Sequence, residues 1–137
     1  MKYPKSPQEK TGGIVYFGRM VEKISLMASG ELHPDLHANL GKAFDQRCVD
    51  FLGVGYEALR EAVLKGLDDR QAIDWCFENG RRPTDEQIEV WNGFMSKRGW
   101  NDDVSKTLAS RKKESGFEER DDIQTMFQYI DADEGRL

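Results

Sequence analysis

The stretch TDEQIEVWNGFMSKRG, residues 84–99, predicts a helix whose beginning and end are both marked in the sequence. Thr84 and Gln87 have the spacing of a capping box, and two acidic residues follow Thr84 in the first turn. A lysine–arginine pair comes before Gly99, which suits the negative end of a helix dipole. Between these ends an apolar stripe recurs every three or four residues, through Ile88, Trp91, Phe94 and Met95.

Similar stripes predict helices on both sides of this segment, and glycines mark where most of them stop. The predicted helices cover roughly residues 14–28, 40–52, 56–65, 72–79 and 102–115, and a last helix starts near residue 121. No segment alternates apolar and polar residues over the length of a strand. The sequence therefore predicts an all-α fold, a compact bundle of about six to seven short helices with no sheet.

The chain length and the placement of its prolines predict the domain organisation. The sequence has 137 residues, which is the size of one ordinary domain. Pro4 and Pro7 restrict the backbone near the N-terminus, and Gly12-Gly13 interrupts the chain just before the first stripe. We expect an extended N-terminal arm over residues 1–13 and a single helical domain over residues 14–137.

Composition excludes several classes of function. The net charge of -5 argues against general nucleic-acid binding, which depends on neutralising phosphates. Apolar runs are too short for a signal peptide or a membrane span, so we expect neither. Cys48 and Cys76 are widely spaced and form no metal-binding motif. Two thiols without a motif suit a reducing compartment, so we expect a cytoplasmic protein.

Both histidines of the chain lie in one polar stretch, HPDLHANLGKAFDQRC, residues 33–48. If Pro34 begins a short helix, His33 and His37 share one face at i and i+4 and are candidates for metal ligands. Asp45, Cys48 or Asp50 could supply a further ligand, but the stretch lacks the glutamate of a zincin motif. We therefore expect no metal and no cofactor, and an ordinary loop is the simpler interpretation of the two histidines.

A metal-free polar pocket is the second hypothesis for this stretch. On a predicted helix over residues 40–52, Asn39, Lys42 and Asp45 follow one another at intervals of three. Together with His37 they are candidates to bind an anion or to move a proton. Surface helices often carry such mixtures, so a solvated surface is the competing interpretation.

A third candidate is the arginine pair in ENGRRPT, residues 78–84. Arg81 and Arg82 lie between the end of one predicted helix and the N-cap Thr84 of the next. Guanidinium groups beside free backbone N–H groups are typical of an anion site. The competing interpretation is that the two arginines cap the carbonyl end of the preceding helix or pair with Glu78 and Asp85.

Several segments resemble those of a family of small bacterial single-domain proteins known only as a domain of unknown function. They include HANLGKAFD (37–45), WCFENGRRPT (75–84) and RDDIQTMFQYIDADEGR (120–136). The resemblance runs from about Pro4 to Arg136. It implies a bacterial protein that consists of this one domain, and it implies no activity, cofactor or ligand.

The sequence leaves two functional hypotheses of different class. The first is a helical binding or regulatory module that recognises a partner protein or a small anionic ligand. The second is a small metal-independent enzyme, a hydrolase or lyase, in which His37 acts as acid or base and Asp45 orients it. We also expect a homodimer, because thin helices leave apolar surface for a partner copy.

Overall fold

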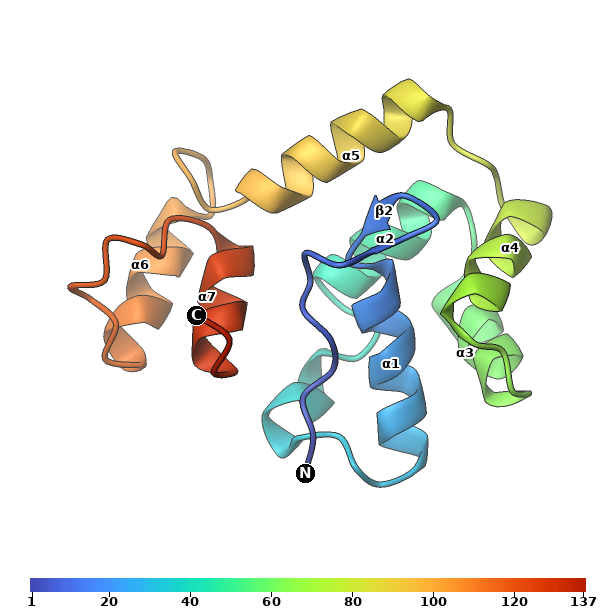
Figure 1. The fold of residues 1–137 in the computed structure, drawn as a ribbon, viewed down its shortest axis with the longest axis horizontal. Coiled ribbons are helices and arrows are strands. Elements are labelled where there is room, and N and C mark those ends of the chain that lie inside the picture. The colour runs from blue at the N-terminus through green and yellow to red at the C-terminus, as the bar shows by residue number, and fades with distance from the viewer.

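Seven α-helices, one 3-10 helix and one short β-hairpin make up residues 1–137 in the computed structural model (Figure 1). The elements are β1 (Lys10–Thr11), β2 (Ile14–Val15), α1 (Phe17–Ala28), η1 (the 3-10 helix Pro34–Asn39), α2 (Phe44–Leu52), α3 (Tyr56–Leu64), α4 (Asp69–Asn79), α5 (Asp85–Lys97), α6 (Ser105–Glu114) and α7 (Met126–Asp133). The predicted all-α class is confirmed. None of the helices is both long and apolar enough to cross a membrane.

The hairpin corrects the prediction that the chain has no sheet. Strands β1 and β2 pair antiparallel across Gly12 and Gly13, whose φ angles of 58° and 80° form the two-residue turn that hairpins favour. Each strand has two residues, too few to show an alternating pattern. The hairpin also delays the first helix, which begins at Phe17 rather than at Ile14. Tyr16, with a φ of 75°, turns the chain from strand to helix.

Helix α1 forms the centre of the main core. Its apolar residues from Phe17 to Ile24 are buried, and the helix packs against α3 and α4. A second, smaller core joins α6 and α7 through Leu108, Ile123, Met126 and Ala132. Figure 1 shows α5 crossing above α1 and α2 and ending beside α6 and α7, so that it links the two parts.

Helix α5 is fastened to the hairpin by two side chains that satisfy the free edge of β2. The Asn92 amide accepts a hydrogen bond from the Val15 N–H (3.0 Å) and donates one to the Gly13 carbonyl (2.8 Å). The Trp91 indole N–H donates to the Val15 carbonyl (3.1 Å). Because strand edges otherwise leave backbone groups unpaired, these bonds fix the position of α5 along the hairpin.

Two further helices begin later than predicted. The predicted helix from residue 40 starts at Phe44, because η1 and a sharp turn at Gly41 and Ala43, both with positive φ, precede it. The last helix starts at Met126, where Thr125 caps the Gln128 N–H. In both cases apolar residues that precede the helix lie in turns. Their spacing matches the helical period, so the sequence pattern does not separate them from the helix.

Candidate functional site

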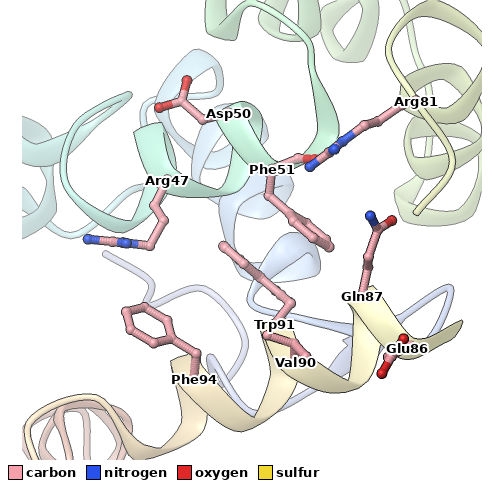
Figure 2. Close-up of a pocket in the computed structure, with 9 residues that line it drawn as sticks. All are labelled: Arg47, Asp50, Phe51, Arg81, Glu86, Gln87, Val90, Trp91 and Phe94. Atoms are coloured by element: carbon pink, nitrogen blue, oxygen red, sulfur yellow. The ribbon is translucent and has the colours of Figure 1, made fainter. Parts of the chain in front are cut away.

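An open groove with a volume of about 640 Å³ lies between α2 and α5 (Figure 2). Helix α2 and helix α5 face each other across it, and the segment after α4 closes one end. The residues that line the groove are Arg47, Asp50, Phe51, Arg81, Glu86, Gln87, Val90, Trp91 and Phe94. Its walls are mostly apolar, with charged groups at the rim.

A single aromatic stack spans the floor of the groove. The rings of Phe51 and Trp91 lie parallel, 4.6 Å apart between centroids and 8° between planes. Trp91 is held by its bond to the hairpin, and Phe51 projects from α2 toward α5 (Figure 2). Helix α5 otherwise packs mainly on β2 and α7. The two stacked rings therefore set the spacing between α2 and α5 at the floor of the groove.

Two arginines flank the stack, and each lies over a phenylalanine ring. The Arg47 guanidinium is 5.0 Å from the centroid of Phe94, and the Arg81 guanidinium is 5.5 Å from that of Phe51. Neither arginine forms an ion pair with a carboxylate of the chain. Stacking on a ring leaves the edge of a guanidinium free, so both groups can donate hydrogen bonds to an anion.

Local backbone geometry at the end of α4 places Arg81. Its N–H donates to the Leu52 carbonyl (2.9 Å), and its Nε donates to the Phe51 carbonyl (2.7 Å). A Cβ on Gly80 would lie 2.1 Å from that same Leu52 carbonyl, so only glycine permits this approach. The chain thus joins α4 to the C-terminal end of α2 and directs Arg81 into the groove.

The predicted arginine pair is divided between two environments. Arg81 lines the groove, whereas Arg82 lies over the Phe77 ring, 4.5 Å from its centroid, and does not line it. Neither pairs with Glu78 or Asp85. Arg47 was not predicted as a site residue, although its position one turn before Phe51 on a helix indicated a shared face.

The polar cluster proposed around His37 is not assembled in the structure. His37 is exposed and its Nε2 lies 2.9 Å from the Leu32 carbonyl, whereas Asp45 is fully buried. No hydrogen bond joins them, because the carboxylate turns into the core instead. Asn39 and Lys42 are exposed and form no side-chain hydrogen bond. The predicted pairing of His37 with Asp45 is therefore absent.

The two histidines also have separate partners. Pro34 begins η1 as predicted, and the His33 Nδ1 accepts the Asp35 N–H at 3.2 Å, so that His33 caps the short helix. The His33 ring stacks on Tyr3, with centroids 4.5 Å apart. No group of three or more His, Cys, Asp or Glu side chains is placed to hold a metal ion.

Asp45 belongs to a buried charged network that the sequence did not reveal. Its carboxylate pairs with the Lys23 ammonium (2.7 Å) and accepts hydrogen bonds from the Tyr16 hydroxyl (2.6 Å) and the Gly41 N–H (2.9 Å). Burial lowers the pKa of Lys23 and raises the pKa of Tyr16 well above its usual value. These groups pair with one another inside the core, so they hold the start of α2 against α1.

Buried acidic groups make the folded state sensitive to alkali, and we expect stability to fall above about pH 9. Burial raises the pKa of Cys76 and Tyr56 to about 12 and raises that of Cys48 well above its usual value. The unfolded chain releases these protons at lower pH than the folded chain. Each group therefore contributes stability that is present below its unfolded pKa and is lost as the pH rises through its folded pKa, at about 1.4 kcal/mol per pH unit.

Urea denaturation at about pH 8 and about pH 10 measures this effect. Between these values the two thiols dominate, since their unfolded pKa is lowest. The lowered pKa of Lys23 acts with the opposite sign and offsets part of the loss. In a Cys48→Ala, Cys76→Ala variant, the free energy of unfolding should differ much less between the two pH values than it does in the parent protein. An equal loss in the variant and the parent would contradict the assignment to the thiols.

Comparison with models of known protein families identifies the family of the chain. The family model described as Domain of unknown function (DUF5069) matches residues 1–136, which agrees with the extent of the resemblance noted in the sequence. No curated protein matches the chain. The description of the family assigns no activity, cofactor or ligand, so the site must be interpreted from its own geometry.

Proposed function

The chain belongs to the family described as Domain of unknown function (DUF5069), and we propose from the geometry of the groove that it is a binding module for an apolar ligand that carries an anionic group. One observation supports this proposal. Arg47 and Arg81, without a carboxylate partner in the chain, flank the stacked rings of Phe51 and Trp91. Convergent polar groups around an apolar hollow are typical of ligand sites.

The chemistry of the ligand follows from the two kinds of surface in the groove. The rings of Phe51 and Phe94 offer apolar area that a hydrophobic or aromatic group would cover. The guanidinium groups above them would donate hydrogen bonds to a carboxylate, sulfonate or phosphate at the edge of that group. A ligand that lacks either part would leave half of the groove unused.

The alternative of a small hydrolase or lyase has no support in the geometry. That hypothesis requires the His37 imidazole to reach Asp45, and Asp45 is enclosed by Lys23 and Tyr16 instead. The groove itself holds no histidine, cysteine or serine that would act as base or nucleophile. Binding is therefore the function that the observed side chains support best.

The proposed compartment is the cytoplasm. Cys48 and Cys76 are both free thiols inside the protein. Two unpaired cysteines in one domain are typical of proteins kept in a reducing environment.

An amphiphilic fluorescent anion, anilinonaphthalene sulfonate, tests the proposed function. We expect Arg47→Gln and Arg81→Gln each to weaken its binding by about threefold to tenfold, because each removes a charged hydrogen bond at a partly exposed site. Arg111→Gln on α6 removes the same charge from an exposed arginine without an ion pair, and should leave binding unchanged. Fluorescence titration measures all four proteins, and thermal unfolding confirms that they are folded.

Equal affinities for all four proteins would overturn the proposed site. An uncharged analogue, phenylnaphthylamine, provides a further control, since it keeps the rings and lacks the sulfonate. We expect the parent protein to bind it more weakly than the anion and the arginine variants to show no such preference. If the parent prefers the uncharged analogue, then the arginines do not select anions.

A further inference from the structure

Helix α5 carries two apolar residues, Val90 and Phe94, that remain largely or partly exposed. Val90 is 65% exposed and Phe94 is 41% exposed, and they lie one turn apart on the same face of the helix. Trp91 and Met95, on the adjacent face, are buried against the rest of the protein. Helix α5 therefore has two apolar faces, of which one packs internally and the other borders the groove.

The shape of the groove fits a segment of chain better than a small molecule. Sites for small molecules bury most of the ligand surface, which requires walls on several sides. Here α2 and α5 provide two walls, while the exposed side chains of Val90 and Phe94 form part of the rim. A helix laid between α2 and α5 would cover this rim and complete a three-helix arrangement, as in other helix-in-groove complexes.

Charge complementarity indicates the character of that segment. Arg47 and Arg81 approach the groove from its two ends and have no carboxylate partner, although the whole chain is acidic. The carboxylates of Asp50 and Glu86 point away from the stacked rings in Figure 2, and Asp50 accepts a hydrogen bond from the Gln46 amide at 2.7 Å. The two arginines at the rim therefore suit carboxylates on either side of an apolar stripe.

We infer that the groove between α2 and α5 docks an acidic amphipathic helix of a partner protein. Apolar side chains at helical spacing would cover the Phe51–Trp91 stack and the rim of Val90 and Phe94. Aspartate or glutamate residues about two turns apart would pair with Arg47 and Arg81. This inference rests on the proposed function and specifies its ligand.

Selection from a displayed library of random peptides of about 16 residues, roughly four helical turns, tests the inference. We expect the recovered peptides to share apolar residues at intervals of three and four with flanking carboxylates. Val90→Glu should weaken the best peptide by at least about tenfold, because it places a charge in the apolar contact. Arg47→Gln and Arg81→Gln should weaken it by about threefold to tenfold, and Arg111→Gln should have no effect.

A charge exchange provides a sharper control than loss of binding. Arg47→Glu should reject the acidic peptide, and a peptide with lysines in place of its carboxylates should bind that variant better than the parent protein. Rescue of this kind requires direct pairing at Arg47. Since Val90 and Arg47 are both exposed, these variants should unfold at the temperature of the parent protein.

The outcomes distinguish failure of the inferred helical ligand from failure of the proposed binding site. If no peptide depends on the groove residues while the sulfonate anion still does, the groove binds small anions only, and the inference fails without the proposed function. If neither depends on them, both fail. Recovered peptides without helical spacing would also overturn the inference. A dimer in sedimentation that Val90→Glu dissociates would place a second copy of the chain in the groove and overturn it as well.

Discussion

Asp45→Asn is expected to destabilise the protein by about 3–5 kcal/mol, although the substitution changes almost no volume. The amide removes the negative charge beside the Lys23 ammonium, 2.7 Å away, and both side chains are enclosed by the core. An ammonium left without its partner in a buried position carries the full cost of desolvation. Urea denaturation near neutral pH measures the change in the free energy of unfolding.

A double-mutant cycle distinguishes the charge pair from simple packing. Lys23→Met removes the cation and keeps an apolar chain of similar length, so it strands the Asp45 carboxylate in the same way. We expect the double variant to lose less than the sum of the two single losses, because no unpaired charge remains. Additive losses would show that the two groups contribute independently and would contradict the ion pair.

The ends of the helices could be predicted from sequence wherever a side chain caps a nearby backbone group. Thr84 and Gln87 form the predicted capping box at the start of α5, with both reciprocal bonds present. Asp68 and Gln71 form a second box at the start of α4, which the same pattern would have identified. Capping involves residues three apart in the chain, so both members of a capping box can be recognised within one short stretch of sequence.

The groove was only partly predictable, because its walls come from distant parts of the chain. Phe94 was assigned to the buried stripe of α5, yet it is partly exposed and borders the groove. The apolar arc of this helix, widened by Val90, exceeds what one packed face requires, and that width was the available signal. Arg81 was identified from its place between two helices. The spacing of Arg47 and Phe51 indicated only a shared helix face, since the role of Arg47 also depends on the ring of Phe94 opposite.

The burial of Asp45 could not be predicted, because its partners precede it by many residues. On a helical projection the carboxylate appears polar and solvated, beside Lys42. In the fold, Tyr16 and Lys23 from the start of the chain reach it first. Periodicity locates the apolar face of a helix, but it does not indicate which charged groups will meet inside the core.

Arg19→Met is expected to cost about 3–5 kcal/mol and to loosen both ends of the chain together. The Arg19 guanidinium donates to both carboxylate oxygens of Glu134, at 2.8 and 2.5 Å, and both side chains are 3% exposed. It also donates to the Lys5 carbonyl at 3.2 Å, so one α1 side chain holds the N-terminal arm and the end of α7. Without it, the Glu134 carboxylate keeps only its bond from Arg136 (2.8 Å).

Hydrogen exchange of the arm and of α7, measured beside urea denaturation, tests this prediction. We expect amides in both segments to exchange faster in Arg19→Met, while those of α3 and α4 change only with global stability. Arg19→Lys should be intermediate, because an ammonium cannot reproduce the bidentate geometry.

Arg120→Met, which breaks a bidentate pair with Asp122 at the surface, should leave stability nearly unchanged. If the Arg19 and Arg120 variants lose equal stability, then burial does not determine the strength of these pairs. Faster exchange in the arm alone would mean that α7 is held by its apolar contacts with α5 and α6 rather than by Arg19.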